Sequence, residues 1–169
     1  LSVRVTDRGG RAIPGLDKNA FSVFDNGRAQ EIRFFSADDV PASVSIVFDS
    51  SASMDGRKIE LARQSIVRFI ATSRPDDEYF LIDFNSKARI LIDRSRDADA
   101  ILEQIKSVQP NGQTALLDAV EVGISRVEKG SRSKKIVLVI SDGEDNRSRS
   151  SLRSLRSRLR EADGVVYAI

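Results

Sequence analysis

The sequence contains no cysteine and no histidine among its 169 residues. The lack of cysteine excludes disulfides, thiolate metal sites and cysteine nucleophiles. The lack of histidine removes Ser-His-Asp triads, nearly all zinc catalysis and the commonest general base at neutral pH. Any metal ion must therefore be bound through oxygen, which indicates a hard cation such as Mg²⁺, Mn²⁺ or Ca²⁺.

Long apolar runs and a large net charge are missing as well. No run approaches the ~20 apolar residues that span a bilayer, so we expect no membrane-spanning segment in this chain. The formal net charge is +2, which indicates no nucleic-acid partner. The chain begins with Leu1 inside a strand-like pattern, and we interpret it as part of a longer protein.

The character of the sequence changes near residue 40. Before that point, short alternating stretches are interrupted by turn residues. Asn26-Gly27 lies between apolar alternations at 21–24 and 32–35 and predicts a hairpin, because both residues tolerate positive φ. Residues 1–38 are interpreted as a small β-rich segment, too short to be stable alone, that packs on the main domain formed by residues 41–169.

From residue 44 onward, predicted strands alternate with predicted helices. The strands are expected at 44–48, 79–84, 88–92, 136–140 and 165–169, and the helices near 59–70, 97–108, 114–127 and 152–159. This order predicts an α/β fold with a doubly wound, mostly parallel, Rossmann-like sheet and helices on both faces. Ligands of such sheets bind beyond the carboxyl ends of the strands, where the strand order reverses.

Two predicted central strands each lead into an acidic loop. Asp49 follows the strand at 44–48, and Asp142 follows the strand at 136–140. Two carboxylates at neighbouring strand ends repel each other unless a cation lies between them. Ser51 and Ser53 alternate with Asp49, so their hydroxyls can reach the same point, and Thr114 brings a further hydroxyl from the start of a helix. Mg²⁺ prefers such oxygen ligands and retains some waters.

These three stretches resemble the metal-ion-dependent adhesion site (MIDAS) of von Willebrand factor A (VWA) domains. Residues 49–53 match the family's Asp-x-Ser-x-Ser motif, residues 113–119 resemble its threonine loop, and residues 140–146 resemble its aspartate loop. The resemblance implies a metal-dependent protein-binding or adhesion module, not an enzyme, in which a partner's carboxylate completes the coordination of Mg²⁺. It implies the ligands Asp49, Ser51, Ser53, Thr114 and Asp142.

The resemblance also implies roles around this shell and a location for the protein. The positions expected at the second shell or rim are Asn85, Asp118, Gly143, Glu144 and Asp145. The N-terminal stretch is similar to the leader of a bacterial VWA-related family abundant in acidobacteria, which implies a secreted or cell-envelope protein. The family normally continues through a further strand and a C-terminal helix, so the domain is expected to be truncated at its C-terminal end.

Other interpretations remain open from the sequence. Ser51 and Ser53 could cap the following helix or close a turn. A metal could merely staple the loops of a structural domain, or Asp49 could be the nucleophile of a metal-dependent phosphoryl-transfer enzyme. Six arginines could form a phosphate-binding face, although an amphipathic helix with Leu152, Leu155 and Leu159 buried is favoured. These are Arg147, Arg149, Arg153, Arg156, Arg158 and Arg160.

Overall fold

A computed structural model describes residues 3, 5–33, 35, 40–162 and 164–169 of the chain. The chain divides into two compact units, Leu1–Val40 and Pro41–Ile169. Within the described residues, none of the helices combines the length and apolar character that crossing a bilayer requires.

The first unit contains the predicted hairpin. Strands β1 (Val23–Asp25) and β2 (Arg28–Gln30) pair antiparallel after a short 3₁₀ helix, η1 (Lys18–Ala20). Asn26 and Gly27 have φ angles of 49° and 76°, as the inner residues of a type I′ turn require. The returning strand is shorter than predicted: β2 ends at Gln30, the described residues 31–33 and 35 lie outside strands, and Phe34 falls outside the described residues.

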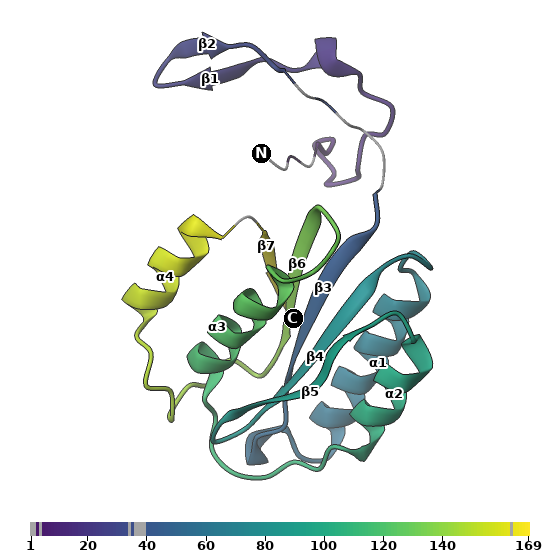
Figure 1. Ribbon diagram of the computed structural model, residues 1–169, viewed down its shortest axis with the longest axis vertical. Coiled ribbons are helices and arrows are strands. Elements are labelled where there is room, and N and C mark those ends of the chain that lie inside the picture. Colours follow the sequence, from purple (N-terminus) through teal and green to yellow (C-terminus); the bar gives the residue numbers. More distant parts are fainter. Residues whose placement is uncertain (1–2, 4, 34, 36–39, 163) are drawn as a thin grey trace. The chain divides into compact units, whose positions relative to one another are not determined.

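The second unit is built on a five-stranded sheet in the order β5-β4-β3-β6-β7 (Figure 1). The strands are β3 (Ala42–Asp49), β4 (Glu78–Phe84), β5 (Ala88–Ser95), β6 (Lys134–Ile140) and β7 (Val165–Ala168). All pairings are parallel except β4 with β5, which form an antiparallel hairpin. The mostly parallel sheet predicted from the sequence is thereby confirmed.

Four helices cover the two faces of this sheet (Figure 1). On one face, α1 (Arg57–Ala71) and α2 (Ala98–Ser107) pack against Ile46 and Phe48 of β3. On the other, α3 (Leu116–Val127) and α4 (Leu152–Glu161) pack against a second cluster that includes Val47. All eight residues of β3 are buried, because alternate side chains of a central strand enter opposite cores.

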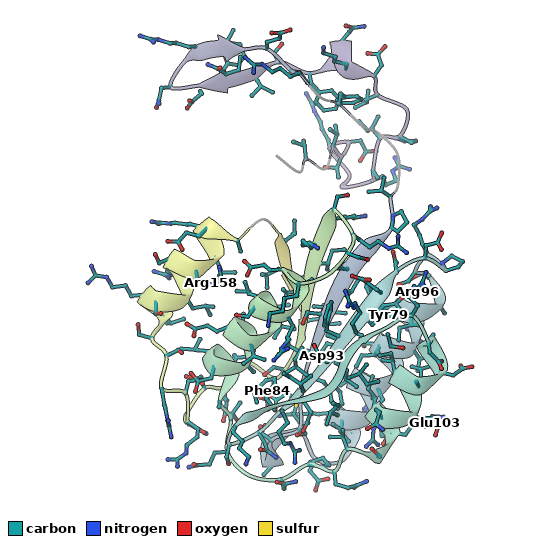
Figure 2. The ribbon with its side chains drawn as sticks, viewed as in Figure 1. Tyr79, Phe84, Asp93, Arg96, Glu103 and Arg158 are labelled. Atoms are coloured by element: carbon teal, nitrogen blue, oxygen red, sulfur yellow. The ribbon has the colours of Figure 1, made fainter. Side chains whose placement is uncertain are left out.

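The central position of β3 sets the place where the strand order reverses. The chain passes from β3 through α1 to β4 on one side, and later returns to the other side of β3 as β6. Phe48 is paired with Ile140 in the parallel register, so the loops after β3 and β6 leave the same edge of the sheet side by side. Figure 2 marks the direction of the strands, with Tyr79 near the start of β4 and Phe84 at its carboxyl end.

Helix boundaries follow local chemistry, with two corrections to the sequence predictions. The carboxylate of Asp97 accepts a hydrogen bond from the amide of Ala100 at 3.1 Å and caps α2 as predicted. Helix α3 begins at Leu116, so Thr114 lies in the preceding loop and does not open the helix. Leu155 is buried and Leu159 packs on the core, but Leu152 is 60% exposed because it lies in the first turn of α4, directly after an exposed loop.

Candidate metal centre

The carboxylates of Asp49 and Asp142 lie at the carboxyl edge of the sheet, where its strand order reverses. Asp49 is the last residue of β3 and is fully buried. Asp142 follows β6 by two residues, and its side chain is 14% exposed. The structure therefore brings the two acids to the edge that the sequence predicted, one inside the protein and one at its rim.

Asp49 is held in place by neutral hydrogen-bond donors. Its Oδ1 accepts from the backbone amide of Ser51 at 2.8 Å, and its Oδ2 accepts from the hydroxyl of Ser141 at 2.6 Å. These contacts orient both oxygens, but neither donor carries a charge that offsets the carboxylate. A buried carboxylate in this setting favours a cation nearby.

The serines of the first loop connect Asp49 to the second acid. The hydroxyls of Ser51 and Ser53 lie 3.1 Å apart. The side chain of Ser53 in turn lies close enough to the carboxylate of Asp142 to lower its pKa. Four of the five predicted metal ligands thus form a continuous series of contacts.

The helix-capping interpretation of these serines is wrong. Helix α1 begins at Arg57, and its N-cap residue is Gly56, which has a φ of 66°. Ser51 precedes the 3₁₀ helix η2 (Ala52–Met54), but its side chain makes no capping hydrogen bond there. The hydroxyls of Ser51 and Ser53 are therefore directed to each other and to the acidic loop.

Lys58 supplies the positive charge closest to the rim acid, and the sequence analysis did not identify it. Its Nζ donates to Oδ2 of Asp142 at 2.8 Å. This hydrogen bond is the largest cause of the raised pKa of Lys58, to which the charges of Asp142, Glu144 and Asp49 add. It is also the largest cause of the lowered pKa of Asp142, which burial opposes and the Ser53 hydrogen bond reinforces. The carboxylates of Asp49, Asp142 and Glu144 therefore stabilise a positive charge beside the loop that follows β6.

The loop that carries Thr114 is tied to the first loop through backbone hydrogen bonds. The amide of Ala52 donates to the carbonyl of Gly112 at 3.1 Å, and the amide of Asn111 donates to the carbonyl of Ser50 at 2.8 Å. Thr114 is buried, and its amide donates to Oδ1 of Asn146 at 2.9 Å. Asn146 thereby joins the threonine loop to the loop that follows Asp142.

Two of the predicted outer residues support this arrangement by bonding to backbone amides. Oδ1 of Asp145 accepts from the amide of Leu116 at 2.9 Å, at the start of α3. Asp118 accepts from the amides of Arg149 and Ser150. Burial acts to raise the pKa of Asp118, but these hydrogen bonds more than offset it and the net pKa is lowered. The ionised carboxylate of Asp118 thus fixes the loop that follows Asp142.

The remaining outer residues shape the loops. Asn85 is buried, its carbonyl accepts from the amide of Ala115 at 2.7 Å, and its side chain donates to Asn111 at 3.0 Å. Gly143 has a φ of 90°, and its amide donates to the Ser141 hydroxyl that holds Asp49. Glu144 is exposed, and its backbone amide bonds to Asp142.

The donor set fits a hard divalent cation. Among the residues that the structure describes, three or more carboxylates do not gather at any one point. The candidate set instead combines two carboxylates with three hydroxyls, and these five side chains come from three loops. Two negative charges with neutral oxygens suit Mg²⁺, which binds proteins through one or two carboxylates and keeps further positions for water or ligand oxygens.

A groove lies between α3, the β4–β5 turn and the loop that follows Asp142. It is lined by Asn85, Ser86, Lys87, Ala88, Arg89, Asn111, Asp118, Val122, Asn146, Arg147, Ser148 and Arg149. Arg89 is paired with the buried Asp83. The carboxylate of Asp118 is engaged by backbone amides, which leaves the groove with an excess of positive charge.

Comparison with known proteins relates this arrangement to one family. Residues 44–144 match the pattern of the von Willebrand factor type A domain. The chain is 29% identical over 109 residues to protein sll0103 of Synechocystis, a match covering 63% of this chain and 26% of that protein. It is 27% identical over 142 residues to human inter-alpha-trypsin inhibitor heavy chain H3, covering 77% of this chain and 16% of that protein. The match thus spans about a quarter or less of each relative.

Solved structures show the same fold. The von Willebrand factor type A structure from Catenulispora acidiphila has a TM-score of 0.63 at 19% identity, covering 76% of this chain and 33% of that chain. The corresponding domain of the type V pili tip protein Mfa5 from Porphyromonas gingivalis has a TM-score of 0.57 at 21% identity, covering 63% of this chain and 39% of that chain.

Proposed function

This chain belongs to the von Willebrand factor type A domain family, whose members generally mediate protein interactions and adhesion, and we propose that it binds a protein partner through a divalent cation. Mg²⁺ is the proposed cation, with Mn²⁺ and Ca²⁺ as alternatives. The residues that would hold it, directly or through water, are Asp49, Ser51, Ser53, Thr114 and Asp142.

The observation that carries this proposal is the meeting of two carboxylates from different strands. Asp49 and Asp142 are 93 positions apart in sequence, yet the register of β3 and β6 places them at one edge, where Lys58 already neutralises Asp142. The side chain of Lys58 is 55% exposed, so it can swing into solvent and leave Asp142 to another cation. Charge complementarity thus supports a cation site, and its oxygen donors support a hard metal ion.

When bound, the cation would supply an open coordination position for an oxygen of the partner's carboxylate. The chain's own residues perform the positioning. Ser141 and the amide of Ser51 hold both oxygens of Asp49, while Asn146 holds the backbone of Thr114. Rigid placement of ligands lowers the conformational cost of binding a partner.

The groove beside the threonine loop supports an acidic partner. Lys87, Arg147 and Arg149 line it, and its carboxylate, Asp118, is already engaged by backbone amides. A partner that presents one carboxylate at the edge of the sheet and further acidic side chains alongside would find complementary charge there. Such complementarity accelerates association and favours acidic partners over basic ones.

Two further functions are less well supported. Phosphoryl transfer with Asp49 as nucleophile is disfavoured, because residue 51 is serine where a two-aspartate nucleophile motif would carry a second acid. A purely structural metal is the stronger alternative, since the three loops are joined by many backbone hydrogen bonds. We propose an extracytoplasmic location, in keeping with the pilus tip protein among the proteins of similar fold.

The Thr114→Ala variant separates ligand binding from loop support, because it removes one neutral oxygen and no charge. Wild-type protein and variant are immobilised and exposed to native cell-envelope extract in Mg²⁺, and bound proteins are eluted with chelator. We expect Thr114→Ala to lose chelator-sensitive retention while its melting temperature changes less than that of Asp142→Ala. An equal loss of melting temperature with retention intact would establish the structural role instead.

A further inference from the structure

A second charged cavity lies at the amino ends of β4 and β6, the opposite end of the strands from the metal loops. It has a volume of about 460 Å³ and is lined by Glu78, Arg94, Ser95, Arg96, Ser131 and Arg132. Glu78 is the first residue of β4 and Ser95 is the last residue of β5. Ser131 and Arg132 precede the start of β6. Figure 2 places Arg96 at the Tyr79 end of β4, away from Phe84.

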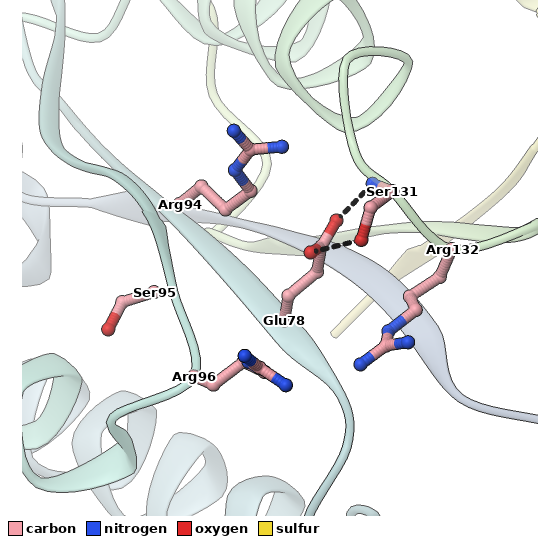
Figure 3. A pocket seen from close by; sticks show the side chains of 6 residues that line it. All are labelled: Glu78, Arg94, Ser95, Arg96, Ser131 and Arg132. Atoms are coloured by element: carbon pink, nitrogen blue, oxygen red, sulfur yellow. Dashed lines mark hydrogen bonds between the residues drawn. The ribbon is translucent and has the colours of Figure 1, made fainter.

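Three guanidinium groups share this cavity with one carboxylate (Figure 3). The carboxylate of Glu78 is already occupied. Ser131 donates to it from both its backbone amide and its hydroxyl, the latter at 2.8 Å, and the hydroxyl of Ser43 donates at 2.9 Å. Glu78 therefore serves as an internal anchor and cannot pair with three arginines at once.

The ionised state of Glu78 follows from the same contacts. Burial acts to raise the pKa of Glu78, but the Ser131 and Ser43 hydrogen bonds, with the charge of Arg94, more than offset it and the net pKa is lowered. Even with this full negative charge, the lining residues carry three positive charges against one. The cavity thus has an uncompensated positive potential.

One arginine that lines this cavity has a strained backbone conformation. Arg94 has a φ of 79°, in the left-handed region that a residue with a bulky side chain seldom adopts. The pairing of β4 with β5 is irregular here, since Tyr79 pairs with Ser95 and Leu81 with Ile92. A bulge of this kind redirects a side chain, and strained residues of this type cluster at ligand sites.

Arg132 supplies an independent indication. Its backbone amide donates to the hydroxyl of Ser43 at 3.1 Å, which fixes the residue at the cavity wall. Its Nε is buried and has no hydrogen-bond partner among the described residues. A buried donor without a partner destabilises the fold, and an anion that reaches this side chain would supply the missing acceptor.

We propose that this cavity binds a tetrahedral oxyanion, a phosphate or sulfate group, between Arg94, Arg96 and Arg132. Three guanidiniums from two separate segments suit an anion with oxygens in several directions better than a single planar carboxylate, which one arginine can satisfy in a bidentate manner. The site lies at the opposite end of the strands from the acidic loops, so its occupancy does not depend on the metal.

Calorimetric titration of the whole chain with inorganic phosphate, inorganic sulfate and a sulfated disaccharide tests this proposal. The double variant Arg94→Gln/Arg132→Gln removes two charges from the cavity, and Arg153→Gln/Arg156→Gln removes two from the exposed side of α4. We expect the wild-type chain and the α4 variant to bind at least one of these probes equally, and the cavity variant to bind it at least ~10-fold more weakly. Chelator should leave the binding unchanged.

The three probes distinguish a free ion from a group carried on a sugar. Preference for either kind supports the site, provided that the loss is confined to the cavity variant. The single variant Arg96→Gln, with a melting temperature equal to that of the wild-type chain, gives the same test if the double variant does not fold. Absence of binding to all three probes, unchanged affinity in the cavity variants, or an equal loss in the α4 variant would each overturn the proposal.

Discussion

Two buried acids in this domain are held in different ways. Glu78 accepts three hydrogen bonds from serines and lies near an arginine, so its charge is compensated locally. Asp49 accepts from two neutral donors, and the nearby Lys58, whose charge it stabilises, donates its hydrogen bond to a second carboxylate, that of Asp142. This difference at the residue scale is why we assign a structural role to Glu78 and a cation-binding role to Asp49.

The lowered pKa of Glu78 predicts a pH-dependent contribution to stability. A carboxyl whose folded-state pKa is depressed stabilises the fold fully above its ordinary value of 4.5, and that contribution is lost as the pH falls through the lowered pKa. Glu78→Gln should therefore destabilise the domain by about 1–3 kcal/mol at neutral pH. The deficit relative to the wild-type protein should shrink as the pH falls below 4.5.

Urea unfolding between pH 7 and pH 3 measures this difference, with Glu103→Gln as the matched control. The Glu103 side chain is 71% exposed on α2 and pairs with Lys106, three residues away. That control should unfold almost as the wild-type protein does at every pH. A Glu78→Gln deficit that stays constant with pH would contradict the assigned cause.

The sequence predicted local features of the site better than distant ones. Asp49, Ser51 and Ser53 could be grouped because alternate positions of an extended loop point the same way. Lys58 could not be paired with Asp142, because the two residues are 84 positions apart and only the packing of α1 against the sheet brings them together. The same holds for Ser141, which reaches Asp49 across 92 positions.

At the scale of elements, each helix was predictable because it has one apolar stripe. Ile59, Ile66 and Ile70 are buried along α1 as their spacing indicated. The errors lie where an element ends. Leu152 fits the stripe of α4 but lies in its first turn, and β2 stops at Gln30 short of the predicted stretch at 32–35. Periodicity reports which face is apolar, not where the supporting surface ends.

The contact between α3 and the sheet predicts a penalty for adding one methyl group. A Cβ at Gly123 would lie 2.6 Å from Cγ2 of Val47 and 3.3 Å from Cγ1 of Val137. Alanine favours the helix by about 1 kcal/mol over glycine, but overpacking a close-packed core costs about 1–3 kcal/mol. Gly123→Ala should therefore lower the free energy of unfolding, by up to about 2 kcal/mol.

Denaturant unfolding of Gly123→Ala and of Ser125→Ala gives this comparison within one helix. Ser125 is exposed, so its replacement by alanine should be neutral or stabilising by a few tenths of a kcal/mol. If Gly123→Ala were as stable as Ser125→Ala, the close approach of α3 to β3 would not be required by the fold.

At the scale of the whole molecule, the predicted doubly wound arrangement is confirmed by the sheet order and by the family match. It was predictable because alternation of strands and helices permits few connections. The arrangement puts two charged sites at opposite ends of the parallel strands of one sheet. The metal loops follow the carboxyl ends of β3 and β6, and the arginine cavity lies at the start of β4.

The N-terminal unit exposes several large apolar side chains. Val3, Ile13 and Phe24 are large apolar side chains in a segment with little core of its own, and burying each is worth roughly 1.5–3 kcal/mol. We predict that the unit packs on the main domain and that deletion of residues 1–38 lowers solubility and melting temperature. Metal affinity should remain, because the proposed ligands all lie at or after Asp49.

Limited proteolysis of the intact chain tests this packing directly. Slow cleavage within residues 1–38, at a rate similar to the rest of the chain, is the expected result. Rapid cleavage throughout that segment, with an unchanged melting curve for the remainder, would show that it is a flexible tether.

The central claim, that Asp49 and Asp142 together bind a divalent cation, is tested most directly by calorimetric titration of the whole chain with Mg²⁺. The wild-type protein should bind one ion, and Asp49→Asn and Asp142→Asn should each weaken binding by at least ~10-fold, because each removes half of the negative charge of the site. Asp99→Asn, on the exposed side of α2, should bind as the wild-type protein does. Equal affinity in the wild-type chain and in both site variants would contradict the account.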